Sequence, residues 1–185
     1  EAVGTIDAAI AVASVRREWG SAWCRPQATG DTRQLHAASL RHPLLPDAVP
    51  NDFQVRGASW LVTGSNMSGK STFLRTVGVN AVLARTIHTV RATRWEGSAF
   101  AVRSCIGRSD SLLEGKSYYL AEVEGVRDLI VESQGGAPTL FILDELFRGT
   151  NTIERIAAAR AVLEALDVAP HLVLSSSDEL RLALR

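Results

Sequence analysis

The sequence predicts an α/β fold in which a mainly parallel sheet is flanked by helices. Two observations favour this class. Short apolar stretches of β-prone residues alternate with longer stretches of helical periodicity. A glycine-rich turn also stands between one such strand and the helix that follows it. The 185 residues suffice for one domain of this kind, with room for a small helical appendage.

The predicted elements follow in chain order. Apolar residues recur at helical spacing over residues 6–23, and no glycine or proline interrupts them before Gly20, so we expect a helix there. Residues 24–52 contain most of the prolines and are predicted as an irregular connector that can include short strands. Strands are expected over residues 59–63, 139–145 and 171–177, and helices after residue 70 and over residues 117–133 and 153–167. We divide the chain into a helix and connector (1–35) and the α/β domain (36–185).

Composition excludes some function classes. The chain has 20 basic residues (Lys and Arg) and 20 acidic residues (Asp and Glu). It therefore has no overall basic field that would draw it onto nucleic acid. No apolar run reaches the roughly 18 residues that a membrane span requires. The two cysteines, Cys24 and Cys105, lack metal-ligand spacing and favour reduced thiols in a cytoplasmic protein. Because the chain starts at Glu1 and ends on an uncapped helical pattern, we expect a fragment of a longer chain.

The run GSNMSGKS at residues 64–71, here called the glycine loop, predicts a P-loop for the phosphates of ATP with Mg²⁺. Gly64 and Gly69 allow backbone conformations that turn N–H groups inward onto phosphate oxygens. Lys70 would reach the β- and γ-phosphates, and Ser71 would ligate Mg²⁺. The alternative is a glycine turn before a helix with a solvated lysine. The predicted nucleotide-binding residues of this segment are Gly64, Ser65, Asn66, Met67, Ser68, Gly69, Lys70, Ser71 and Thr72.

Two carboxylates close the apolar strand at 139–145. At the carboxyl edge of a parallel sheet, where ligands bind, Asp144 would hold the Mg²⁺ shell. Glu145 would orient or deprotonate the attacking water. Adjacent strand residues point to opposite sides, which suits two separate roles. The alternative is a solvated turn at the end of a strand.

Five stretches together resemble a known family. They are RHPLL at 41–45, PNDF at 50–53, TGSNMSGKSTFLR at 63–75, EGKSYYLAEVEGVRDLI at 114–130 and LDELFRGTNTIERIAAA at 143–159. In this combination the chain resembles the ATPase domain of the MutS family of DNA mismatch-repair proteins, relatives of the ABC-type ATPases. The resemblance implies an ATPase that pairs with a second copy or a MutS-like subunit, and double-stranded DNA held by regions outside this chain. The helix at 6–23 resembles the end of the family's lever helices.

The resemblance also assigns single residues. Ser117 matches the serine that reaches across the dimer to the partner's γ-phosphate; by itself it also suits a helix N-cap. Residues 149–151 match a loop that couples the two nucleotide sites, and alone they read as a turn with a helix cap. His42 and Pro43 match the segment near the adenine, and Asn51 matches a residue that shapes the loop under the nucleotide. A His-Pro pair is also common in ordinary loops.

One departure concerns the catalytic residues. The family places a threonine-histidine pair at the end of the next strand, and here Ser176 stands where the histidine is expected, or Ser177 after a one-residue shift. A serine cannot carry the imidazolium charge, so we expect hydrolysis either to be slow or to be performed with Glu145 alone, with binding retained. This leaves open a nucleotide-dependent dimerisation switch with little turnover. A transporter-type ATPase fits less well, because residues 114–120 read EGKSYYL rather than a Leu-Ser-Gly-Gly run. No Phe-x-Glu mismatch wedge occurs in the chain.

Overall fold

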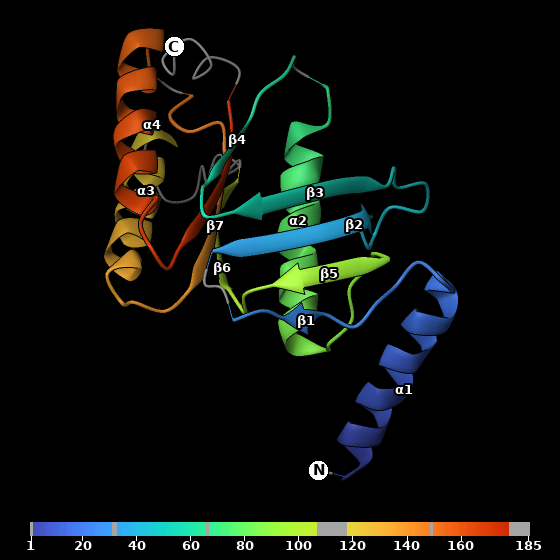
Figure 1. The fold of residues 1–185 in the computed structure, drawn as a ribbon. Coiled ribbons are helices and arrows are strands. Elements are labelled where there is room, and N and C mark those ends of the chain that lie inside the picture. Colours follow the sequence, from blue (N-terminus) through green and yellow to red (C-terminus); the bar gives the residue numbers. More distant parts are fainter. Residues whose placement is uncertain (1, 31–32, 66, 107–117, 149, 178–185) are drawn as a thin grey trace.

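The computed structural model describes residues 2–30, 33–65, 67–106, 118–148 and 150–177 (Figure 1). These residues form two four-stranded sheets with helices packed on them. Helix α2 (Lys70–Thr86) lies between the two sheets, and helices α3 (Tyr118–Ser133) and α4 (Thr152–Leu166) lie together at the other side of one sheet (Figure 1).

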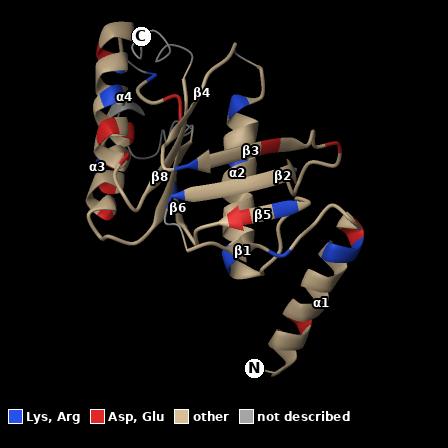
Figure 2. Cartoon of the chain, in the orientation of Figure 1, with Lys and Arg blue, Asp and Glu red and all other residues tan. Residues whose placement is uncertain are grey.

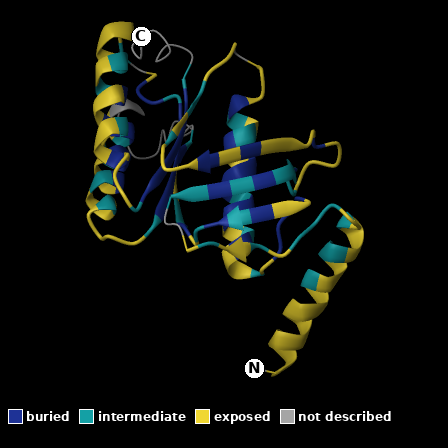
Figure 3. Cartoon of the chain, in the orientation of Figure 1, coloured by how far each residue is buried: buried dark blue, intermediate teal, exposed yellow. Residues whose placement is uncertain are grey.

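The first sheet has the strand order β4 (Trp60–Val62), β8 (Leu172–Ser176), β7 (Thr139–Asp144), β6 (Ala101–Ile106), and every pairing in it is parallel. All six residues of β7 are buried, because both faces of the strand are covered (Figure 3). Leu140 and Ile142 pack in one core with α2, whereas Phe141 and Leu143 pack in the other with α3 and α4. The predicted α/β class and the strands at 59–63, 139–145 and 171–177 are therefore confirmed.

The second sheet has the order β1 (Gln27–Ala28), β5 (Arg94–Gly97), β2 (Gln34–Leu40), β3 (Asn51–Arg56). Strand β2 is antiparallel to both β3 and β5. The prediction for residues 24–52 allows short strands, and strands are present; the irregular description is wrong for β2, a seven-residue strand paired on both sides. The prolines that suggested it, Pro43, Pro46 and Pro50, all lie in the connection between these two strands, where no ladder hydrogen bond is lost.

Helix α1 (Ala2–Trp19) projects away from the sheets and has no buried residue (Figures 1 and 3). It ends at Trp19 rather than at the predicted residue 23, because Gly20 adopts a φ of 56°, the left-handed conformation that ends helices. Its last turns are attached to the segment after α2. Arg16 Nε donates to Thr89 Oγ1 at 2.9 Å, and the Arg16 guanidinium lies 4.7 Å from the centre of the Trp23 ring.

The structure also bears on the charges, the cysteines and the membrane spans considered from composition. Positive and negative side chains share the same helices, as on α1 and α4 (Figure 2). The cysteines Cys24 and Cys105 are thiols, and burial raises the pKa of Cys24 to about 11. None of the helices in the described part of the chain is both long enough and apolar enough to cross a bilayer.

Candidate functional site

The glycine loop connects β4 to α2 at the carboxyl end of the parallel sheet, as the sequence predicts. Gly69 is the N-cap of α2 with a φ of 92°, a conformation that strains any side chain. A Cβ on Gly64 would lie 3.1 Å from Ser68 Oγ, so the loop closes tightly over this glycine. The loop therefore presents the positive end of α2 without a capping side chain at Gly69.

Lys70 lies inside the curve of the glycine loop. Only 6% of the residue is exposed, and its Nζ donates to Gly64 O at 2.8 Å and to Ser65 O at 3.0 Å. The ammonium group is thus held by backbone carbonyls across the loop rather than solvated, which disfavours the simple glycine turn. A buried cation beside a helix N-terminus is the arrangement that binds an anion.

Two cavities flank Lys70, and both include Gly69 and Thr72 in their walls. The larger cavity, of about 520 Å³, extends along the start of α2 to the loop over residues 41–50 that joins β2 to β3. The residues that line this cavity include His42, Leu45 and Asn51. The smaller, of about 250 Å³, extends the other way to the end of β7 and is lined by Met67, Gly69, Lys70, Ser71, Thr72, Glu145 and Arg148. Lys70 therefore lies between a cavity that extends to His42 and one that contains Glu145 and Arg148.

The two carboxylates at the end of β7 have different surroundings. Asp144 is 9% exposed and accepts a hydrogen bond from Ser176 Oγ of the neighbouring strand β8, at 2.5 Å. Glu145 leaves the strand with a φ of 49°, and its N–H donates to Ser176 O at 3.2 Å. Its carboxylate faces the smaller cavity and forms an ion pair with Arg148. The predicted separation of the two acidic groups into different environments is therefore present.

His42 lies in the wall of the larger cavity. Its pKa is lowered from the usual histidine value, first by partial burial and then by the charges of Arg75 and Arg91. Its Nδ1 accepts a hydrogen bond from the N–H of Leu44 at 3.2 Å, which leaves the proton of the neutral ring on Nε2. At neutral pH the cavity therefore presents an uncharged imidazole.

The structure brings most of the predicted residues to this place. Ser68, His42 and Asn51 line the larger cavity, while Met67 and Ser71 line the smaller one. Ser176 is not among the residues that line either cavity; its hydroxyl contacts Asp144 instead. The predicted residues Asn66, Ser117 and Gly149 lie outside the described residues.

The segment after the acidic pair begins helix α4. Asn151 is its N-cap and accepts a hydrogen bond from the N–H of Glu154 at 3.0 Å, while the Thr150 hydroxyl donates to the Glu154 carboxylate at 2.7 Å. The capping role proposed from the sequence is therefore present. Sequence reasoning missed Arg148, the partner of Glu145, although it is three residues away on the same turn. It also missed Asn80, a fully buried polar residue in the middle of α2.

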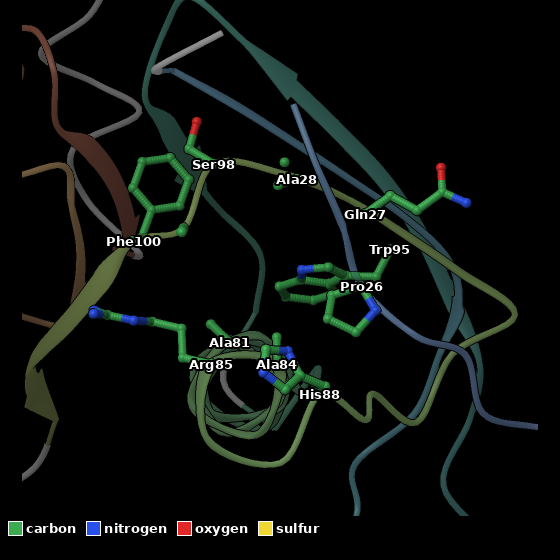
Figure 4. A pocket seen from close by; sticks show the side chains of 12 residues that line it. Pro26, Gln27, Ala28, Ala81, Ala84, Arg85, His88, Trp95, Ser98 and Phe100 are labelled. Carbon is green, nitrogen blue, oxygen red and sulfur yellow. The ribbon is translucent and has the colours of Figure 1, made fainter. Parts of the chain in front are cut away.

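A third cavity lies at the opposite end of α2 (Figure 4). Its volume is about 230 Å³, and its walls include Ala84, His88, Trp95 and Phe100. None of its lining residues belongs to the glycine loop or to the acidic pair. The glycine loop and the acidic pair therefore lie away from this cavity, at the other end of the helix.

The fold and the site together define a class of protein. It is an α/β domain in which a glycine loop follows one parallel strand and an acidic pair stands at the end of another. Residues 60–175 match the family described as MutS domain V. The chain is 38% identical over 165 residues to the DNA mismatch repair protein MutS of Thermus aquaticus, covering 87% of this chain and 20% of that protein. It is 33% identical over 173 residues to the DNA mismatch repair protein msh3 of Aspergillus fumigatus, covering 89% and 15%.

The chain belongs to the MutS family, and the predicted family membership is confirmed. A third relative, the MutS protein of Erythrobacter litoralis, is 36% identical over 177 residues, or 90% of this chain. The chain spans about a fifth of the length of these bacterial relatives.

Proposed function

We propose that the chain binds ATP with Mg²⁺ at the glycine loop and hydrolyses it slowly. The observation that carries this proposal is the position of Lys70, buried in the loop with a cavity on either side. This position supports the P-loop interpretation. The two ends of a nucleoside triphosphate bound over Lys70 would lie in different cavities. One end extends toward His42 and the other toward Glu145.

The larger cavity suits the nucleoside. Its volume of about 520 Å³ lies within the range of roughly 300–1,000 Å³ usual for small-molecule sites. The phosphates would replace the carbonyl contacts of Lys70 and take N–H donors from the loop and the first turn of α2. Ser71 and Asp144 supply the hydroxyl and carboxylate oxygens that suit Mg²⁺. The ion would neutralise charge on the phosphate oxygens.

The smaller cavity suits the terminal phosphate and the attacking water. Glu145 is the carboxylate that faces this cavity together with Lys70 and Ser71. From there it would accept a proton from water aligned with the phosphate, or orient that water. Lys70 and the loop N–H groups would stabilise the charge that develops on the phosphate. Before it can act on water, Glu145 must loosen its ion pair with Arg148.

We further propose that two copies, or one copy and a MutS-like subunit, complete the site between them. Ser117 of one subunit would reach the γ-phosphate bound by the other. Apolar side chains at the same edge of the domain support an interface: Met67 is fully exposed, and Ile153 at the start of α4 is 82% exposed. The nucleotide state would then move a clamp on double-stranded DNA formed by regions outside this chain. The relatives are named as DNA mismatch repair proteins, which supports a role on DNA.

A second candidate function is a nucleotide-dependent dimerisation switch with little or no turnover. The Ser176 hydroxyl donates its hydrogen to Asp144 and lines neither cavity. No charged donor therefore stands at the position where the resemblance expects a histidine. The presence of Glu145 in the smaller cavity favours the ATPase.

Calorimetry and phosphate release separate these functions. We expect the wild-type chain to bind ATP with Mg²⁺, and Lys70→Met to weaken binding by about 10- to 100-fold, the worth of a charge-assisted hydrogen bond. Hydrolysis should rise faster than linearly with protein concentration and fall by about 10²- to 10⁴-fold in Glu145→Gln, which should still bind ATP. Binding without turnover at any concentration would refute the ATPase and favour the switch, and absence of binding would refute both functions.

A further inference from the structure

The loop over residues 41–50 forms one wall of the larger cavity, and its shape depends on an arginine outside the cavity. Arg91 Nη1 donates to His42 O at 2.8 Å and to Leu45 O at 2.9 Å, with Pro43 O at 3.4 Å. The N–H of Leu45 also donates to His42 O at 3.3 Å, so this segment is a turn whose carbonyls converge on one guanidinium. Arg91 does not line the cavity; it contacts the cavity wall through this turn, and its charge also helps to lower the pKa of His42.

The arginine itself is fixed by the helix that carries Lys70. Asn80 of α2 is fully buried; its Oδ1 accepts from the N–H of Arg91 at 2.8 Å, and its Nδ2 donates to Arg41 O at 3.0 Å. Arg41 N–H in turn donates to Arg91 O at 2.8 Å. The backbone at both ends of this arrangement is therefore held to α2, whose first residue is Lys70.

These contacts lead to different expectations for the two halves of the site. Lys70 is held by Gly64 and Ser65, and neither contact involves the 41–50 loop. The wall that contains His42 and Leu45 is instead held by Arg91. A change at Arg91 should therefore alter one half of the site and leave the other unchanged.

We propose that Arg91 is a positioning residue that sets the shape of the nucleoside end of the cavity, and so the affinity for the base and sugar of a nucleoside triphosphate. This inference rests on the proposed function. A guanidinium serves this turn well because its planar set of N–H donors holds several carbonyls in one geometry. Without it, the converging carbonyls lose a charged donor and the turn relaxes. Preorganised walls favour binding because the bound ligand need not order them.

The test compares two ligands, ATP and inorganic tripolyphosphate, each with Mg²⁺, by calorimetry on the wild-type chain and on Arg91→Met. Methionine retains an unbranched side chain but has no donor. We expect the variant to bind ATP about tenfold more weakly, with tripolyphosphate affinity within about twofold of wild type. Arg160→Met on the exposed face of α4, which removes an arginine paired with Glu164, is the matched control and should change neither affinity.

Each outcome decides the question. Unchanged ATP affinity in Arg91→Met, or an equal loss for both ligands, would overturn the positioning role. If the wild type binds neither ligand, the proposed function fails and this inference fails with it. If Arg91→Met does not fold, Arg91→Lys replaces it. Lysine supplies a point charge without the planar set of donors, so we expect a smaller loss that is again confined to ATP; no selective loss would overturn the proposal.

Discussion

Gly78 of α2 packs against Ile142 of β7, and these two elements carry Lys70 and Asp144. A Cβ built on Gly78 would lie 2.6 Å from Ile142 Cδ1, about 1 Å nearer than the roughly 3.5–4.0 Å of an ordinary carbon contact. The next Ile142 atom, Cγ1, would lie 4.0 Å away. Because both residues are buried, Gly78→Ala pushes a single methyl group into a filled core.

Whether Gly78→Ala lowers or raises the free energy of unfolding should depend on Ile142 Cδ1. Alanine gains about 1 kcal/mol in helix propensity over glycine, whereas overpacking costs about 1–3 kcal/mol, so Gly78→Ala should lower the free energy of unfolding by about 1 kcal/mol. Ile142→Val removes Cδ1 and costs about 0.5–1.5 kcal/mol by itself. In that background Gly78→Ala meets no close contact and should instead raise stability by up to about 1 kcal/mol.

Urea denaturation of the wild type, both single variants and the double variant measures this as a double-mutant cycle. We expect a coupling free energy of about 1–3 kcal/mol. Gly4→Ala is the control for helix propensity alone, because a Cβ at Gly4 in α1 meets nothing within 4 Å. If Gly78→Ala has the same sign and size in both backgrounds, the packing argument for how α2 meets β7 is wrong.

Two further changes test the helix cap and the histidine. Asn151→Ala should lower the free energy of unfolding by about 1 kcal/mol because the N–H of Glu154 loses its acceptor, while Asn151→Asp should be nearly neutral; equal urea curves for all three proteins would contradict the cap. For His42 the pKa is lowered in the folded protein, so the unfolded chain takes up the proton first as the pH falls. Stability should therefore decrease below the ordinary histidine pKa, down to the folded one, and His42→Gln should reduce this decrease. An NMR titration that places the ring at or above its ordinary pKa would show the reverse sign.

The features predictable from sequence are those encoded by neighbouring residues. The strand before Gly64, the helix after Lys70 and the apolar run before Asp144 each carry their signal within a few residues. A parallel sheet could be predicted because helices separate these strands along the chain, and parallel strands need such crossover connections. The glycine loop could be placed because strand, turn and helix follow one another directly.

The second sheet was harder to predict because its strands mix polar with apolar residues and contain no long apolar run. Strand β2 pairs with β3 across the proline-containing 41–50 loop and with β5 beyond α2. Its burial alternates imperfectly, since a register shift falls between Ala37 and Leu40. Single-chain periodicity therefore gave a weak signal, and the loop prolines dominated the interpretation.

Side-chain partners within the site were also beyond sequence reasoning. The positive φ of Glu145, which turns its carboxylate toward the smaller cavity, is a backbone conformation that no local composition demands. The contacts of Arg91 span 46 to 49 positions of the chain, so only the folded structure brings them together. Asn80 offered one sequence signal, a polar residue among the apolar residues of a helix.

Helix α1 is a rod attached at one end. Its 18 residues extend about 27 Å at 1.5 Å per residue, and its contact with Thr89 lies just past the end of α2 opposite the glycine loop. A tilt of about 10° at that attachment would carry the far end of such a rod through roughly 5 Å. An adjustment at one end of α2 too small to disturb the sheets can therefore become, at the tip of α1, a displacement as large as the pitch of a helix.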